Sequence, residues 1–395
     1  MQLQRSVWRV AALGMAAACV AVVPAVTAQA QQVGQIRHAG GATAVSGSYI
    51  VVLKGASAAN ASGLAAKYGA KVARVYSYAL RGFEARVSQA GAQRLAADPA
   101  VAYVEQNHTV SLNDTQLNPP SWGLDRVDQR RLPLSNSYTY PNNGTGVRAY
   151  IIDTGIRFTH VDFGGRAVSG FDAIDGGTAD DCNGHGTHTA GTTGGSSFGV
   201  AKGVTLVAVR VLNCSGSGTF AQVIAGIDWV TGDHDPGELA VANMSLGGGP
   251  DTATDNAVRN SIADGVTYSL SAGNSNANAC NQSPARTLEA ITVGATDIRD
   301  RRASFSNFGT CLDLFAPGVN ITSAWVTSDT ATNTISGTSM AAPHVTGAAA
   351  IVTAAHPTWT PQQVRDKIVA DATAGAVKKP GTGSPNLLLF VSQTP

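Results

Sequence analysis

Three residues in separate glycine-rich segments could together carry out nucleophilic catalysis. Ser339 lies in the segment Gly337–His344, His185 begins a His-Gly-Thr-His segment, and Asp153 is followed by Thr-Gly. A serine is a poor nucleophile at neutral pH, so it needs an imidazole to accept its proton and a buried carboxylate to orient that imidazole. The sequence therefore predicts acyl transfer, with Ser339 as nucleophile, His185 as general base and Asp153 as its partner.

The small residues after Ser339 predict a helix that begins at this serine. Free N–H groups at a helix N-terminus stabilise negative charge, so the Ser339 N–H can form half of an oxyanion hole. A zinc site at His185 and His188 is the alternative. No glutamate lies between the two histidines and no third ligand follows at the spacing of zinc proteases, so we expect His188 to be a packed neighbour.

The segments that must position these residues alternate between buried strands and helices. Apolar runs of the kind found in strands buried on both faces occupy 147–152, 204–211, 239–244, 266–271 and 290–293, and helical patterns occupy 220–230 and 252–264. This alternation predicts an α/β fold with a doubly wound, mostly parallel sheet. Function is expected at the carboxyl ends of the strands, where Asp153, Ser245 and Asn274 fall.

A smaller domain of different pattern precedes this sheet. Strands are predicted at 48–53, 72–78, 82–87 and 101–105, with helices at 58–68 and 90–97. The order β-α-β-β-α-β is that of a small α+β ferredoxin-like domain, which we assign to residues 48–113. The proline- and asparagine-rich stretch 112–120 marks its junction with the domain at 114–395.

The first 47 residues are expected to be an export signal and a connector. Arg5 and Arg9 precede an apolar run at 10–23, and Ala28-Gln29-Ala30 offers a cleavage site, so residues 1–30 are predicted to be a signal peptide. The apolar run is short for a membrane anchor. Residues 31–47 lack an apolar period and are predicted to form a flexible linker.

The motifs in the order Asp153, His185, Ser339 resemble those of the subtilisin-like serine proteases, nearest the proteinase K and aqualysin branch. The resemblance covers the chain from Trp122 onward. Residues 48–113 resemble an inhibitor-type propeptide, with its Tyr-Ile-Val-Val-Leu-Lys opening. This implies a self-processing precursor whose propeptide acts as folding chaperone and temporary inhibitor, with a cut near Asn113-Asp114. The alternative is a permanent regulatory domain.

The same resemblance implies roles for further residues. Asn274 would supply the second oxyanion donor. Two segments would pair with an extended substrate as added strands, where small residues allow backbones to approach. The first segment begins at Ser215 and continues with Gly216, Ser217 and Gly218. The second consists of Ser245, Leu246, Gly247 and Gly248. Ala272 and Gly273, with Gly247, would form a roomy pocket for an apolar or aromatic residue before the scissile bond.

Calcium is the expected structural cofactor, and no organic cofactor is expected. Asp125, Asp128 and Gln129 have the spacing that puts three oxygen donors on one helix face, with Ser135 and Ser137 close behind. This set resembles a calcium site of the aqualysin branch. A second site, by resemblance to proteinase K, would join Asp313 to the carbonyls of Leu288 and Ala290. A solvated helix turn and an ordinary buried aspartate are the alternatives.

Four cysteines remain once Cys19 leaves with the signal, and they allow three pairings. An exported protein meets an oxidising compartment, so we expect disulfides between neighbours in the sequence, Cys182 with Cys214 and Cys280 with Cys311. Four buried free thiols are the alternative.

Composition excludes several classes of function. The net charge is +1, from 27 Lys and Arg against 26 Asp and Glu, which argues against nucleic acid or a membrane surface as partner. From the motifs and what the resemblance implies, we expect a secreted, monomeric serine endopeptidase of broad specificity, exported directly or by way of a periplasm, whose partners are protein substrates and its own propeptide. A non-catalytic binding protein on the same scaffold is the alternative from another class.

Overall fold

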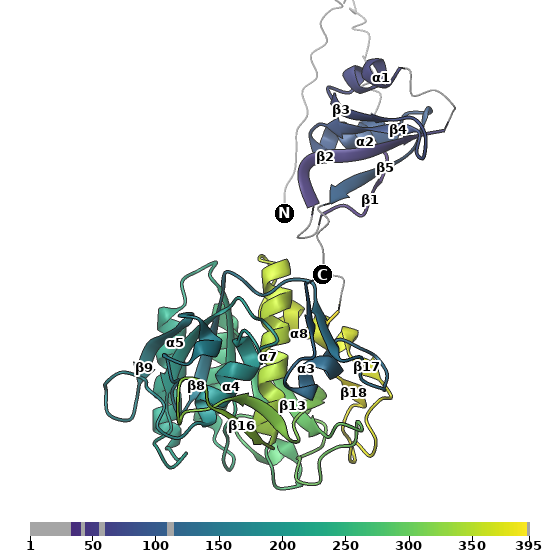
Figure 1. Cartoon of the computed structure of the whole chain (residues 1–395). Coiled ribbons are helices and arrows are strands. Elements are labelled where there is room, and N and C mark those ends of the chain that lie inside the picture. Colours follow the sequence, from purple (N-terminus) through teal and green to yellow (C-terminus); the bar gives the residue numbers. More distant parts are fainter. Residues whose placement is uncertain (1–32, 41–43, 55–59, 109–113, 393–395) are drawn as a thin grey trace, which may run out of the picture. The chain divides into compact units, whose positions relative to one another are not determined.

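The computed structural model describes residues 33–40, 44–54, 60–108 and 114–392, and Figure 1 traces them as two compact units. The smaller unit contains residues 45–107 and the described residues before 40, and the larger unit contains the chain from 108 onward. The predicted signal peptide, residues 1–30, lies outside the described residues, as does Asn113 of the expected cleavage site.

The smaller unit has the predicted β-α-β-β-α-β order. Its elements are β2 (Ala44–Leu53), α1 (Ala61–Lys67), β3 (Lys71–Tyr76), β4 (Gly82–Arg86), α2 (Gln89–Ala96) and β5 (Val101–His108). The sheet order is β1-β5-β2-β4-β3. Val51, Phe83, Leu95 and Val104 are fully buried in its core, so the alternating apolar residues of the strands meet the apolar face of α2.

The expected linker at 31–47 is partly ordered. Ile36–Arg37 forms β1, which pairs parallel with β5, and β2 already begins at Ala44. Ile36 is buried in the core of the smaller unit. The structure contradicts a flexible linker at these residues, because Ile36 docks a short strand on the core although the stretch has no apolar period.

The larger unit is built on a nine-stranded sheet. Its strand order is β17-β18-β14-β13-β12-β11-β8-β10-β9, and neighbouring strands are parallel except β17 and β18, which are antiparallel. The strands are β8 (Val147–Asp153), β9 (Ala167–Asp172), β10 (Thr205–Arg210), β11 (Leu239–Met244), β12 (Thr267–Ser271), β13 (Ile291–Thr296), β14 (Leu314–Pro317), β17 (Thr373–Ala374) and β18 (Leu387–Leu388).

Helices cover both faces of this sheet, as a doubly wound fold requires. One face packs against α4 (His185–Gly194), α7 (Thr338–Ala355) and α8 (Pro361–Asp371), and the other packs against α5 (Phe220–Asp233) and α6 (Thr252–Asp264). In Figure 1, α7 runs through the middle of the larger unit. The predicted fold class is therefore confirmed, and β8 lies between β10 and β11, where the strand order reverses.

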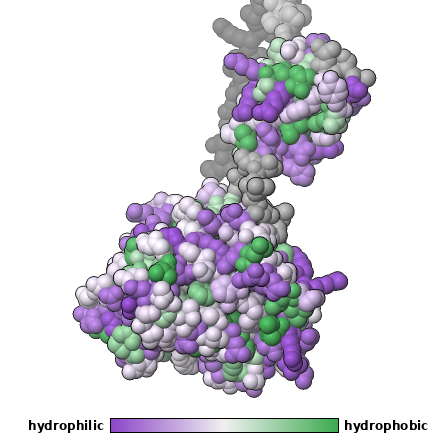
Figure 2. Space-filling model, viewed as in Figure 1, coloured by the Kyte–Doolittle hydropathy of each residue, from purple (hydrophilic) through white to green (hydrophobic). Residues whose placement is uncertain are grey.

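Short elements complete the larger unit. They are α3 (Trp122–Val127), the hairpin-like pair β6 (Asp114–Leu117) and β7 (Ser137–Tyr140), the pair β15 (Ile321–Ala324) and β16 (Thr332–Ile335), and two 3-10 turns at Val161–Phe163 and Ala279–Asn281. Figure 2 shows small, separate apolar patches on the visible face of this unit. Among the described residues, no helix is both long and apolar enough to cross a membrane.

Both expected disulfides are present in the larger unit. Cys182 bonds to Cys214 and Cys280 bonds to Cys311. Each closes a loop of about thirty residues, which in the loop-entropy treatment destabilises the unfolded chain by roughly 3 kcal/mol. The prediction of neighbouring pairs is confirmed, and the first disulfide ties the segment before His185 to the segment before Ser215.

Candidate active site

The three predicted catalytic residues come from three elements that start or end at the same edge of the sheet. Asp153 is the last residue of β8, at the point where the strand order reverses, and it is fully buried. His185 is the first residue of α4, and Ser339 is the second residue of α7. Carboxyl ends of parallel strands and N-termini of the following helices share one edge, which is why residues so far apart in sequence meet.

A glycine allows the chain to turn sharply into α4. Gly184 caps the helix with φ of 108°, and a Cβ there would lie 2.6 Å from the ring of Trp325. Asp181 holds the same turn: its Oδ1 accepts hydrogen bonds from the N–H groups of Asn183 and Gly184, each at 2.9 Å. Sequence reasoning missed Asp181, although an aspartate two residues before Asn183-Gly184 fits a turn in which the side chain accepts from the backbone two residues on.

The histidine and the aspartate form a close pair. The Nδ1 atom of His185 lies 2.7 Å from Oδ1 and 2.9 Å from Oδ2 of Asp153. Burial lowers the pKa of His185, but the Asp153 carboxylate more than offsets this, so the pKa is raised above its ordinary value. With Nδ1 occupied as a donor, Nε2 is the nitrogen left to accept a proton.

Ser339 is hydrogen-bonded to the second of the two predicted substrate segments, residues 245–248. Its Oγ donates to the carbonyl of Ser245 at 3.1 Å, and the Ser245 Oγ donates to the Ser339 carbonyl at 2.8 Å. His185 and Ser245 both line the cavity described below. No hydrogen bond between Ser339 and His185 is found among the described residues, and such contacts are often long until substrate binds.

Two N–H donors flank one small space beside Ser339. A Cβ on Gly337 would lie 3.5 Å from the Ser339 backbone nitrogen and 3.6 Å from Nδ2 of Asn274. The Oδ1 atom of Asn274 accepts from the Thr338 N–H at 2.8 Å and from the Thr338 hydroxyl at 2.9 Å. This orientation leaves Nδ2 of Asn274 free to donate, as an oxyanion hole requires.

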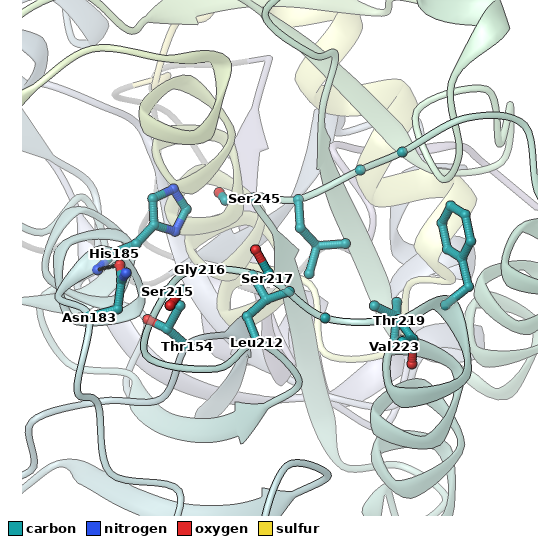
Figure 3. A pocket seen from close by; sticks show the side chains of 15 residues that line it. Thr154, Asn183, His185, Leu212, Ser215, Gly216, Ser217, Thr219, Val223 and Ser245 are labelled. Atoms are coloured by element: carbon teal, nitrogen blue, oxygen red, sulfur yellow. Dashed lines mark hydrogen bonds between the residues drawn. The ribbon is translucent and has the colours of Figure 1, made fainter.

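The predicted substrate segments line one open cavity of about 570 Å³. Both segments, 215–218 and 245–248, contribute to it, together with Thr154, Asn183, His185, Leu212, Thr219, Phe220 and Val223. Figure 3 shows His185 at one end, Thr219 and Val223 at the other, and Ser217 between them. Leu212, Phe220 and Val223 contribute apolar side chains to the lining, so the groove can hold an extended chain that carries an apolar residue.

Two residues expected at the pocket for the residue before the scissile bond lie outside this cavity. Ala272 is fully buried in a separate apolar cluster. Gly273 is covered by neighbouring amides, because a Cβ on it would lie 2.0 Å from Oε1 of Gln282 and 2.4 Å from Nδ2 of Asn307. Gly247 does line the cavity. Sequence reasoning missed Gln282 because an isolated polar residue carries no pattern.

His188 is a buried structural neighbour of the site, as expected. Its Nε2 lies 3.0 Å from the carbonyl of Ile321, and burial lowers its pKa to about 3. His344 is buried on α7, where its Nδ1 lies 2.8 Å from the Met340 carbonyl, and burial lowers its pKa to about 4. Both histidines are therefore neutral at ordinary pH.

The residues expected at the first calcium site do gather. Ser135 Oγ lies 3.0 Å from Asp125 Oδ1 and 2.9 Å from Ser137 Oγ, and the Ser135 N–H donates to Oε1 of Gln129 at 3.1 Å. Asp128 Oδ1 is buried and has no partner within the described residues. Burial raises the pKa of Asp128 to about 6. The other oxygen of Asp128, Oδ2, accepts a hydrogen bond from the Thr139 N–H at 2.7 Å. A buried carboxylate oxygen left unpaired fits a hard cation.

At the second expected calcium site, an arginine contacts the residues that were expected to bind the ion. The Asp313 carboxylate lies 2.5 Å from Nη2 of Arg365, and Nε of the same arginine donates to the Ala290 carbonyl at 3.2 Å. An arginine therefore joins two of the three expected ligands, and these residues do not fit a calcium site. Among the described residues, no cluster of three or more His, Cys, Asp or Glu could hold a metal ion.

Comparisons with known proteins agree with the geometry. Residues 144–386 match the Subtilase family and residues 48–113 match Peptidase inhibitor I9. An extracellular serine proteinase of Thermus sp. (strain Rt41A) is 58% identical over 82% of this chain and 78% of its own length. Alkaline serine exoprotease A of Vibrio alginolyticus is 51% identical over 82% of this chain and 61% of its own length.

A solved structure is also similar. A cold adapted subtilisin-like serine proteinase superposes with a TM-score of 0.66 at 53% identity, over 69% of this chain and 98% of that one. Together with the matches above, this likeness extends over the sheet, the candidate site and the smaller unit. The chain therefore belongs to the subtilase family of serine-type endopeptidases.

Proposed function

We propose that this protein is a secreted, self-processing endopeptidase that cleaves protein chains through Asp153, His185 and Ser339. The observation that carries the proposal is the buried Asp153 carboxylate bonded to Nδ1 of His185 at 2.7 Å, at the same edge of the sheet as Ser339. This is the pairing that a serine nucleophile needs.

The chemical steps follow from the positions of these groups. The Ser339 oxygen attacks the scissile carbonyl while Nε2 of His185 accepts its proton. The developing oxyanion lies between the Ser339 N–H and Nδ2 of Asn274. The protonated imidazole, stabilised by Asp153, then gives its proton to the leaving amine, and water repeats the sequence on the acyl-enzyme.

The substrate is an extended segment of protein chain that pairs with residues 215–218 and 245–248. Small side chains in these segments leave the backbone accessible, so recognition through the main chain gives broad specificity. Leu212, Phe220 and Val223 line the cavity and favour an apolar side chain in the substrate. Near the reacting bond, Gly247 lines the cavity and favours an apolar or aromatic residue.

The domain at 48–113 acts as chaperone and inhibitor until the chain cuts itself near Asn113-Asp114. Support comes from the match of these residues to an inhibitor family and from the strand β6, which begins at Asp114. A large, mostly parallel sheet has many non-local contacts and folds slowly, so a preformed domain that docks on it would speed folding. Residues 1–30 would direct export.

Asp125, Asp128, Gln129, Ser135 and Ser137 would hold a structural calcium ion. When bound, the ion neutralises the buried Asp128 carboxylate and fixes the segment between α3 and β7. The hydroxyl and amide oxygens of the chain then keep this segment in place against the sheet. No catalytic step depends on this ion.

The decisive experiment compares processing of the wild type with Ser339→Ala. We expect two fragments from the wild type, with a new N-terminus near residue 114, and an uncut precursor from Ser339→Ala and from His185→Ala. Ser328→Ala, in an exposed turn, is the matched control and should process like the wild type. Equal processing of all four proteins would mean that a foreign protease cuts the chain and would favour a non-catalytic binding protein.

A further inference from the structure

Asp313 precedes β14 and directs its carboxylate into the interior, where only 10% of the side chain is exposed. One oxygen, Oδ2, accepts a hydrogen bond from the Thr292 N–H at 2.8 Å. The other oxygen, Oδ1, lies 2.5 Å from Nη2 of Arg365. Both carboxylate oxygens are thus engaged, one by the backbone of β13 and one by a guanidinium.

The same guanidinium contacts a second oxygen of this corner. Nε of Arg365 donates to the carbonyl of Ala290 at 3.2 Å. Asp313 and Ala290 are the two groups that a calcium ion would have to bridge if this were a metal site of the kind that the sequence suggested. Arg365 therefore makes with one cationic group the contacts that an ion would make.

Arg365 is held in place by a well-anchored helix. It lies in α8, whose N-terminus has a capping box formed by Thr360 and Gln363. Its neighbours Val364 and Ile368 are 1% and 3% exposed and belong to the main core. The arginine side chain is 24% exposed, so its stem is partly covered while its head reaches the carboxylate.

The same oxygens cannot bind a calcium ion and this guanidinium at once. Calcium binds six to eight oxygens at about 2.3–2.6 Å, so its carboxylate and carbonyl ligands must point at one common centre. In this structure the planar guanidinium of Arg365 lies where that ion would have to lie, and its positive charge would repel a calcium ion. A paired, planar guanidinium also suits a partly buried carboxylate better than a solvated ammonium would.

We propose that Arg365 takes the place of calcium at Asp313, so that this corner of the protease is held by an internal cation and binds no metal. The corner joins β13, β14 and α8 through one side chain. Its stability is consequently independent of calcium concentration, and any dependence on calcium resides elsewhere in the chain.

The test measures bound calcium and thermal stability on the mature protein, inhibited with phenylmethylsulfonyl fluoride to prevent self-digestion. After equilibrium dialysis against calcium, the wild type and Asp313→Asn should contain the same number of calcium ions per chain, measured by mass spectrometry of the metal. A loss of one ion per chain in a folded Asp313→Asn protein overturns the proposal.

A second variant keeps the proposal testable if Asp313→Asn fails to fold. In excess chelator, Arg365→Gln should lower the thermal midpoint by roughly 5 °C, because it leaves a buried carboxylate without its cation. The control is Arg259→Gln, which breaks the exposed pair with Glu289, whose side chains are 38% and 47% exposed, and should shift the midpoint by about 1 °C or less. An unchanged midpoint for Arg365→Gln in chelator would contradict the internal-cation role.

Discussion

Thr338 holds the amide of Asn274 through two hydrogen bonds to one oxygen, from its backbone N–H at 2.8 Å and from its hydroxyl at 2.9 Å. The Thr338 hydroxyl in turn accepts a hydrogen bond from the Gly273 N–H at 3.1 Å. The residue before the proposed nucleophile therefore sets the direction of the Asn274 amide, the proposed oxyanion donor, a role that the sequence alone did not suggest.

Replacing Thr338 by valine should lower kcat by about tenfold while KM changes little, since one of the two bonds that orient Asn274 is lost. Thr338→Ser keeps the hydroxyl and should stay within about twofold of the wild type. Steady-state kinetics on a peptide substrate measure both constants. An increase in KM at constant kcat would instead assign Thr338 to substrate binding.

Asn274→Ala should lower kcat by about 10²- to 10³-fold, the loss measured for an oxyanion donor of this family. The expected loss is larger than for Thr338→Val because the donor itself disappears. Circular dichroism and the thermal midpoint should match the wild type. Turnover close to that of the wild type would leave Asn274 as a turn residue only.

The rate should depend on pH through His185, whose pKa is raised above its ordinary value. The neutral imidazole is the active base, so kcat/KM should rise as pH increases and level off above that raised pKa. A pH profile of kcat/KM between 5 and 10 measures the midpoint. A midpoint clearly below 6.5 would contradict the Asp153–His185 pairing as the dominant influence.

The buried histidines should make the fold sensitive to acid. Burial lowers the pKa of His188 to about 3 and that of His344 to about 4. Below about pH 6.5 the unfolded chain binds protons that the folded chain does not, so stability is full above that pH and falls as pH decreases toward the folded-state pKa values. Each histidine contributes roughly 1.4 kcal/mol per pH unit in this window.

Comparison of two proteins isolates this effect. In His344→Gln, the slope of unfolding free energy against pH between 6 and 4.5 should decrease by roughly 1.4 kcal/mol per pH unit. Denaturant titrations on the inhibited mature protein measure the slope, and other titrating groups cancel because both proteins share them. Equal slopes would mean that His344 is protonated in the folded state.

Removal of calcium should lower the thermal midpoint of the wild-type mature protein, because the buried Asp128 carboxylate loses its cation. Asp128→Asn should abolish most of the difference between calcium and chelator. Scanning calorimetry with and without chelator measures both proteins. A wild-type midpoint that ignores the chelator would rule out the site at Asp125 and Asp128.

The fold could be predicted from the sequence because it depends on strong local signals, and the three motifs around Asp153, His185 and Ser339 were enough to propose the candidate site. The apolar strands at 147–152 and 239–244 appear as β8 and β11, since strands buried on both faces leave uninterrupted apolar runs. The relationships that sequence reasoning missed are contacts of polar side chains across the fold, such as Arg365 with Asp313 and the amide of Asn307 with the carbonyl of Ala272. No periodicity records such contacts, because each depends on one side chain meeting another group across the fold.

The pair of β6 and β7 would hold the N-terminus that the proposed self-cleavage creates. β6 begins at Asp114 and pairs with β7, which begins at Ser137. A cut at Asn113-Asp114 would thus leave Asp114 as a chain end already paired with Tyr140, and the neighbouring Thr139 donates its N–H to Asp128 of the candidate calcium site at 2.7 Å. Aminopeptidases outside the cell would trim that end slowly while calcium is bound and faster once it leaves. Calcium would therefore set the working lifetime of the protease. Mass spectrometry of the N-terminus over time, with and without chelator, would measure this.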